Sequence, residues 1–300
     1  MKTVRLQLPA TSANLGPGFD ALALALDIFL EIDAATAPHF SIEASGRNPE
    51  ICGELENNLL VETYRSVLEG ERRQVSPLAV RVQNGIPLGM GCGSSAAVRL
   101  AGVALAAHFG SLGWSEKRIV ETAARLEGHP DNVAACWYGG LTIAAGGNER
   151  LSTLSISPPS DWRALLVLPT KPVSTAKSRS VIPETYSRGD AVKNIQNVAL
   201  LTAAFALRQA DLLALATQDA LHQPFRTQLC PLLPVLLPLA GRRGVLSVTL
   251  SGAGPAVLLL CSGDLSPVAQ EIVERSKALG PVEVLEAGLW GEGAVTTSSL

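Results

Sequence analysis

Alternation of apolar and polar residues along the chain predicts several short β-strands. Val4–Leu8 alternates up to Pro9, and Phe40–Ala44 and Leu78–Val82 show the same period of two, which is typical of a strand with one buried face. Other short segments are apolar at nearly every position, as expected of strands that are buried on both faces. The remaining predicted strands are Leu141–Ala145, Trp162–Pro169, Leu246–Leu250, Ala256–Cys261 and Val282–Ala287.

A second group of segments repeats its apolar residues every three or four positions, which predicts helices. Asn58–Leu68 has this spacing, with Asn57 or Asn58 as the cap of the first turn, and Ser115–Leu126 is amphipathic with a serine at its start. Ala21–Ile32 is apolar almost throughout, so a helix and a strand are both compatible with it. The other predicted helices are a small-residue segment that ends near Phe109, Asp190–Gln209, Asp211–Leu221 and Leu265–Leu279.

The order of these elements predicts an α+β protein with two domains. A segment rich in Ser, Pro and Asp, Ser152–Asp161, separates two element groups. We therefore place one domain at residues 1–157 and a second at residues 158–300. The second half, with the order strand, helices, two strands, helix, strand, predicts a small α+β sandwich.

Composition excludes several classes of protein. The 300 residues carry a net charge of −3 and only 4% aromatic side chains, which argues against a nucleic-acid partner. The longest apolar region, Leu229–Ala240, is too short and too interrupted by prolines to span a membrane, and the N-terminus lacks a signal-peptide pattern. Five cysteines without a Cys-x-x-Cys pair indicate reduced thiols in the cytoplasm and no zinc site.

A glycine-rich segment before the helix that ends near Phe109 is the main candidate for chemistry. Alternating glycines allow close backbone approach to a ligand, and the free amides and dipole of a helix N-terminus favour phosphate. No Lys follows, so this is not the common NTPase phosphate loop. A tight turn entering a buried helix remains the alternative. The segment comprises Pro87, Leu88, Gly89, Met90, Gly91, Cys92, Gly93, Ser94, Ser95, Ala96 and Ala97.

Two further motifs lie far from this loop in sequence. Pro9–Asp20 reads PATSANLGPGFD, and its Asn and Asp side chains could simply bond their own backbone in a turn. Thr249–Val257 reads TLSGAGPAV and could be a hairpin connection whose glycines adopt positive φ. The occurrence of all three motifs in this order is a stronger signal than any one of them.

The three motifs resemble those of the GHMP kinases, and most of all the homoserine kinases within that superfamily. The segments Glu127–Val133, Ser174–Arg179 and His222–Arg226 carry the same resemblance, which spans nearly the whole chain. Cys92 departs from it, because the family usually has Leu there. The resemblance implies a GHMP kinase fold, with an N-terminal domain like the second domain of ribosomal protein S5, a ferredoxin-like C-terminal domain and a site in the cleft between them.

The resemblance also implies roles for particular residues in ATP-dependent phosphorylation of L-homoserine to O-phospho-L-homoserine, a step of threonine biosynthesis. The loop would hold the phosphates of ATP, Asn58 would contact the adenine, and Ser95 and Glu127 would bind Mg²⁺. Arg179 and Arg226 would bind the substrate carboxylate. Asn14, Asp20, His129 and Asn132 would surround the amino and hydroxyl groups of homoserine.

Catalysis would depend on alignment, because no residue is a convincing general base. A loose phosphoryl-transfer transition state needs little early deprotonation of the hydroxyl. Thr175 would orient the γ-phosphate, and His129 and Asn14 would complete the catalytic set.

Two alternative functions remain open at this point. Another GHMP enzyme, such as a mevalonate or sugar kinase, is disfavoured by the arginine pair, because a neutral sugar has no carboxylate to match it. A binding protein of the same fold without catalysis is disfavoured by the intact loop, Ser95 and Glu127. The resemblance also makes a homodimer plausible and inhibition by threonine possible.

Overall fold

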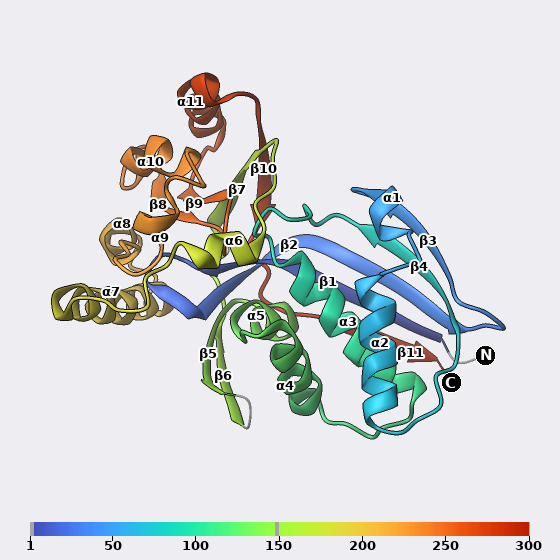
Figure 1. Cartoon of the computed structure of the whole chain (residues 1–300). Coiled ribbons are helices and arrows are strands. Elements are labelled where there is room, and N and C mark those ends of the chain that lie inside the picture. Colours follow the sequence, from blue (N-terminus) through green and yellow to red (C-terminus); the bar gives the residue numbers. More distant parts are fainter. Residues whose placement is uncertain (1–2, 148–149, 300) are drawn as a thin grey trace.

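Two β-sheets organise the molecule (Figure 1). The computed structural model describes residues 3–147 and 150–299. The first sheet has the order β11-β1-β2-β4-β3, with β5 paired to β2 and β6 paired to β5. Its strands are β1 (Thr3–Asn14), β2 (Gly18–Thr36), β3 (Ser41–Gly46), β4 (Leu78–Asn84), β5 (Leu141–Gly147), β6 (Arg150–Ile156) and β11 (Val295–Ser299).

Strands β1 and β2 are longer than predicted. β1 does not end at Pro9 but continues to Asn14, because a shift in pairing register between Pro9 and Ala10 accommodates a proline that cannot donate a ladder hydrogen bond. The apolar segment Ala21–Ile32 is a strand, part of β2. It pairs with β1 on one side and with β4 and β5 on the other, which accounts for its burial.

Of the helices between β3 and β5, α2 to α5 lie side by side over one face of the first sheet, and α1 lies apart beside β3 and β4 (Figure 1). β3 and β4 are parallel and are connected through the first two of these helices. Of the two asparagines predicted as alternative caps, Asn58 is the cap and accepts two backbone N–H groups, and the predicted cap Ser115 accepts one. The helices are α1 (Pro49–Cys52), α2 (Leu59–Gly70), α3 (Ser94–Phe109), α4 (Glu116–Glu127) and α5 (Asp131–Tyr138).

The second sheet is fully antiparallel and has the order β10-β7-β9-β8. With helices after the first and third strands in sequence, this is the predicted ferredoxin-like arrangement. Its strands are β7 (Trp162–Pro169), β8 (Val245–Leu250), β9 (Val257–Ser262) and β10 (Val282–Gly288). Its helices are α6 (Thr175–Ser180), α7 (Arg188–Ala206), η1 (Ala210–Leu212), α8 (Leu213–Ala216), α9 (Gln223–Arg226), α10 (Leu232–Leu236), η2 (Leu237–Leu239), α11 (Ser266–Ser276) and η3 (Lys277–Leu279).

The predicted helix Asp211–Leu221 is wrong over its second half. The helical segment ends at Ala216. The Asp219 carboxylate then accepts the backbone N–H groups of Leu221, His222 and Gln223, so it turns the chain into α9. A short acidic side chain that bonds nearby amides competes with a continuing helix.

The division of the chain at residues 157 and 158 stays a prediction, but strand pairing departs from it at the C-terminus. The link between the two sheets lies between the end of β6 at Ile156 and the start of β7 at Trp162. β11 returns to the first sheet, however, and pairs with β1, so Thr3 lies opposite Ser299. In the described part of the chain, none of the helices has the length and apolar character that a membrane span requires.

We expect the packing of α7 on the second sheet to be a main source of stability. Phe205 is buried and meets Trp162 edge to face, with ring centroids 5.3 Å apart. Phe205→Ala should lower the free energy of unfolding by about 3–5 kcal/mol, through lost burial and a residual cavity. Val192→Ala, on the exposed side of α7, is the control and should change it by less than about 0.5 kcal/mol. Urea unfolding measures both, and equal effects would contradict this packing.

Candidate active site

The glycine loop is shaped by close contact with the other two motifs. Gly91 and Gly93 have φ of +81° and +71°, and Gly93 is the N-cap of α3. A Cβ on Gly91 would lie 2.2 Å from the Ser251 carbonyl oxygen, and one on Gly93 would lie 1.9 Å from Thr11 Oγ1. Only glycine fits at these positions, whatever the loop binds.

Cys92, the residue that departs from the family pattern, is buried between these glycines. Burial raises the pKa of its thiol to about 12, so the side chain is neutral and packs as a small apolar group. Its carbonyl oxygen accepts the Thr11 N–H at 3.1 Å.

The turn at Ser251–Gly252 connects the three motifs. Ser251 Oγ lies 2.9 Å from Ser12 Oγ in the Pro9–Asp20 motif, which comes first in sequence. It also donates to the Gly91 carbonyl of the glycine loop at 2.8 Å. The Gly252 carbonyl accepts from Asn14 Nδ2 at 2.9 Å. The turn is thereby bonded to segments 160 and 239 residues away in sequence.

Backbone strain gathers in the first motif. Asn14, Leu15 and Asp20 all have positive φ, which non-glycine residues rarely adopt. Asn14 supports this turn, because its Oδ1 accepts the Asp20 N–H at 3.1 Å. The alternative interpretation, that Asn14 only bonds the backbone of its own turn, is therefore partly right. The Asn14 side chain also donates to the Gly252 carbonyl in the second half of the chain. Such strain is commonly retained where a site requires it.

Asp20 and Arg179 form a two-bond ion pair between β2 and α6. Arg179 Nη1 and Nη2 donate to the two Asp20 carboxylate oxygens at 3.0 and 2.6 Å. This pairing raises the pKa of Arg179 further above its ordinary value. Two parallel hydrogen bonds fix both side chains in the mouth of the cleft.

Arg226 is a buried guanidinium beside this pair. It is 1% exposed and donates to the Ser178 carbonyl oxygen at 3.1 Å. Burial, and then the charge of Arg179, lower the pKa of Arg226 to about 10, so it stays protonated at neutral pH. The Phe19 ring, which sequence reasoning missed, lies under both arginines, with each Cζ 5.5 Å from its centroid.

His222 is held neutral behind Arg226. Its ring is fully buried, and burial lowers its pKa to about 4. Arg226 Nη1 donates to Nδ1 at 2.9 Å, so the proton is on Nε2, which donates to the Gly16 carbonyl oxygen at 2.8 Å. A neutral His222 therefore positions Arg226 without a second positive charge.

The connection from α4 to α5 carries three of the site residues. His129 lies between the two helices, and Asp131 and Asn132 begin α5. His129 Nδ1 is 2.6 Å from Asp131 Oδ1. Burial disfavours protonation of His129, but the hydrogen bond and charge of Asp131 outweigh it and raise the pKa. Asn132 Oδ1 accepts from Thr11 Oγ1 at 2.6 Å, which ties α5 to β1.

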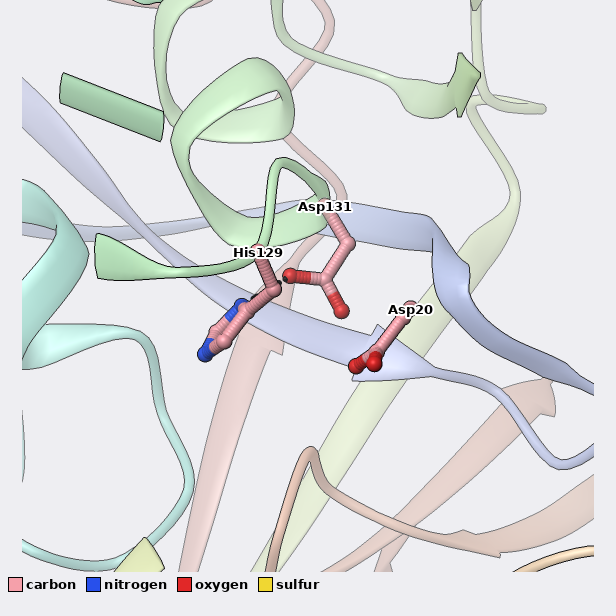
Figure 2. Close-up of side chains that lie close together, drawn as sticks. All are labelled: Asp20, His129 and Asp131. Atoms are coloured by element: carbon pink, nitrogen blue, oxygen red, sulfur yellow. Dashed lines mark hydrogen bonds and ion pairs between the residues drawn. The ribbon is translucent and has the colours of Figure 1, made fainter. Parts of the chain in front are cut away.

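Asp131 was not singled out from the sequence, yet it orients His129. Figure 2 shows His129, Asp131 and Asp20 converging from two elements, with ligand atoms within 4.8 Å of one another. This cluster suits Mg²⁺ less well than a set of oxygen ligands, because Mg²⁺ prefers oxygen to imidazole.

Ser95 and Glu127 provide the oxygen atoms that suit Mg²⁺. Ser95 Oγ donates to Glu127 Oε2 at 2.9 Å, and the Glu127 side chain is only 11% exposed although it ends α4. Both oxygens lie at the N-terminus of α3. A magnesium ion that keeps several waters fits this donor set.

Most of the predicted substrate and phosphate residues line one cleft. The cleft has a volume of about 300 Å³ and adjoins a largely apolar pocket of about 350 Å³, and Ser94 and Ser95 line both. The predicted residues that line the cleft are Asn14, Asp20, Gly89, Gly91, Cys92, Gly93, Ser94, Ser95, Glu127, His129, Asn132, Arg179 and Arg226.

A few predicted residues are placed differently. Asn58 and Leu88 line the apolar pocket, but the Asn58 amide already caps α2 and bonds the Cys52 and Glu54 carbonyls. Thr175 begins α6, and its side chain lies outside what the structure describes. Pro87, Ala96 and Ala97 are buried, and the Met90 carbonyl accepts the Ala256 N–H.

Comparison with known proteins identifies a family for this arrangement. Family models described as "GHMP kinases N terminal domain" and "GHMP kinases C terminal" match residues 58–140 and 200–281. Homoserine kinases of Solibacter usitatus and Moorella thermoacetica are 42% and 38% identical over 275 and 263 residues, which are 90% and 86% of this chain and 88% and 87% of those proteins.

A solved structure agrees with the sequence relatives. The homoserine kinase of Cytophaga hutchinsonii superposes with a TM-score of 0.78 at 25% identity, covering 98% of this chain and 97% of that one. The chain therefore belongs to the GHMP kinase family, and within it to the homoserine kinases. The predicted GHMP kinase fold is confirmed.

We expect the buried neutral His222 to make stability depend on pH. An unfolded histidine takes up a proton near pH 6.5, whereas the folded pKa is about 4. Below about pH 6.5 the unfolded state takes up a proton at His222 that the folded state does not. The free energy of unfolding therefore has its full value above about pH 6.5 and falls as the pH falls toward 4. In His222→Gln, the drop in unfolding free energy between pH 6.5 and 4.5 should be smaller by roughly 2 kcal/mol.

Urea unfolding at both pH values measures this difference. His39→Gln, at an exposed position, is the control and should keep the wild-type pH dependence. A His222→Gln variant that loses as much stability as the wild type over this range would show that His222 is not held neutral.

Proposed function

We propose that the protein transfers the γ-phosphoryl group of ATP to the side-chain hydroxyl of L-homoserine. The observation that carries the proposal is the arrangement of Asp20, Arg179 and Arg226 in a cleft that opens onto the glycine loop. An α-amino acid has a positive ammonium and a negative carboxylate. The cleft offers one negative side chain, Asp20, for the ammonium and two positive ones, Arg179 and Arg226, for the carboxylate. The family relationship adds the identity of the reaction.

On the acceptor side, the arginines bind the substrate carboxylate and Asp20 binds the ammonium. Arg226 is rigid, because the Ser178 carbonyl and His222 fix its guanidinium. Arg179 is half-buried and pairs with Asp20, so neither charge is left alone before the substrate enters. Asn14, His129 and Asn132 surround the rest of the amino acid and direct its hydroxyl toward the loop.

On the nucleotide side, the loop amides and the N-terminus of α3 bind the phosphates. The adjoining apolar pocket, lined by side chains such as Leu30, Ile32 and Val82, receives the adenine, with Asn58 at its edge. Ser95 and Glu127 hold Mg²⁺, which would offset charge on the phosphates during transfer.

Catalysis follows from alignment rather than from a dedicated base. Burial lowers the pKa of His129, but the hydrogen bond and charge of Asp131 raise it on balance and hold Nδ1, so we assign the ring to positioning the acceptor. Asn14 is fixed by two hydrogen bonds, and we assign Thr175, the first residue of α6, to orienting the γ-phosphate. A cytoplasmic location and a homodimer remain predictions.

An assay of ADP release tests the proposal against its alternatives. With Mg-ATP, L-homoserine should support turnover, whereas mevalonate and galactose should not. ADP release with mevalonate or galactose and none with homoserine would identify a different GHMP activity. No turnover with any of the three, together with tight homoserine binding, would support a protein that binds without catalysis.

We expect Glu127→Gln to lower kcat by about 10²-fold or more, because it keeps the shape of the side chain but removes the charge that would hold Mg²⁺. Homoserine binding without nucleotide should change little. Glu116→Gln, exposed at the other end of α4, is the matched control and should keep wild-type kinetics. Steady-state kinetics at several Mg²⁺ concentrations measures this, and near-normal turnover of Glu127→Gln at low Mg²⁺ would remove Glu127 from the metal site.

We expect Arg226→Ala and Arg179→Ala each to lower kcat/KM for homoserine. The loss should correspond to about 2–5 kcal/mol of transition-state stabilisation. The substrate carboxylate would lose one partner, and a misplaced hydroxyl would miss the γ-phosphate. ATP affinity should be nearly unchanged. Lys variants should recover only part of the loss, because an ammonium lacks the planar fork.

Kinetics with ATP and homoserine varied separately distinguish these outcomes. Arg188→Ala, exposed at the start of α7, serves as the control. Wild-type KM and kcat for homoserine in both Ala variants would show that the arginines do not bind the substrate.

A further inference from the structure

Arg99 contacts Glu127 in the candidate metal site. It is on α3 one turn after Ser95, so both side chains lie on the same face of the helix. Its Nε is 2.8 Å from Glu127 Oε2, the oxygen that also accepts from Ser95. The side chains of Arg99 and Glu127 are 28% and 11% exposed, so water screens this pair less than a surface pair.

The contact between Arg99 and Glu127 is an ion pair without a well-formed hydrogen bond. The buried Nε of Arg99 has no hydrogen-bond partner among the described residues. Because this N–H is not aligned on the Glu127 oxygen, Arg99 is not committed to that carboxylate and can donate to another acceptor at the site. The phosphate oxygens of ATP, which accept readily from guanidinium groups, would lie at the adjacent N-terminus of α3.

We propose that Arg99 makes this site select the metal–nucleotide complex over the free divalent ion. The inference rests on the proposed function only in placing Mg²⁺ and ATP at Ser95 and Glu127. A lone Mg²⁺ would enter beside a guanidinium that already offsets the charge of Glu127, and two cations at such short range repel strongly. Mg²⁺ also gives up its water reluctantly, so a weakened carboxylate ligand binds it poorly.

The same guanidinium attracts the metal when it arrives with ATP. The triphosphate carries about four negative charges at neutral pH, so the magnesium complex remains an anion. That anion is favoured by Arg99 and by the N-terminus of α3 together. A single side chain thus opposes binding of the bare ion and supports binding of its complex. The catalytic metal would then enter together with ATP.

Binding experiments without homoserine test the proposal. Mn²⁺, followed by electron paramagnetic resonance in place of Mg²⁺, reports binding of the bare ion, and calorimetry with Mg-ATP reports the complex. Arg99→Gln should bind Mn²⁺ about tenfold more tightly than the wild type and Mg-ATP about tenfold more weakly. Arg99→Lys keeps the charge and should stay near the wild type in Mn²⁺ binding.

Two further variants make the result decisive. Arg99→Met keeps an unbranched side chain, and is measured in parallel so that a folding defect in one variant does not settle the question. Arg125→Gln removes an exposed positive charge from α4 and should leave both affinities unchanged. Wild-type Mn²⁺ affinity in folded Arg99→Gln and Arg99→Met would overturn the proposal, as would equal shifts in Arg125→Gln. Because no acceptor is present, failure of homoserine as a substrate would leave these results unaffected.

Discussion

The turn at Ser251–Gly252 is the constraint on which the candidate site depends. Its polar groups are buried between the two sheets and must be hydrogen-bonded there. They find partners in Ser12, Asn14, Gly91 and Arg226, that is, in the first motif, the glycine loop and the second half of the chain. Glycines are required where these segments meet, since a Cβ on Gly91 would collide with the turn itself. The shape of the cleft therefore depends on the hydrogen bonds that the three turns make with one another.

Internal charge pairing is the second organising feature. Asp20 pairs with Arg179, Asp131 with His129, and Glu127 with Arg99. Each pair places groups of opposite charge at the cleft without leaving a half-buried charge alone, which would be costly. A zwitterionic amino acid and a metal–nucleotide complex both carry charges of the two signs. When such ligands bind, ion pairs between side chains of the cleft would be replaced by ion pairs with the ligand, with little change in the net charge of the cleft.

Much of this could be predicted from the sequence because the relevant signals are local. Strand alternation, the caps Asn58 and Ser115 and the three glycine motifs each depend on a few neighbouring residues, and the family resemblance supplied the pairing of distant motifs. Long-range features could not be predicted in that way. The return of β11 to β1, the role of Phe19 under two arginines and the Asp131 contact with His129 depend on the tertiary fold. Asp219 ended a predicted helix because its side-chain bonds competed with the backbone.

Identification of the reaction product tests the central claim most directly. Phosphorus-31 NMR of the protein with Mg-ATP and L-homoserine resolves a phosphomonoester from inorganic phosphate and from the phosphates of ADP. The account predicts ADP and one new phosphomonoester in equal amounts, with the phosphorus coupled to the γ-methylene protons of homoserine. Release of inorganic phosphate with unmodified homoserine would contradict it, since the cleft would then be directing water and not the amino-acid hydroxyl at the γ-phosphate.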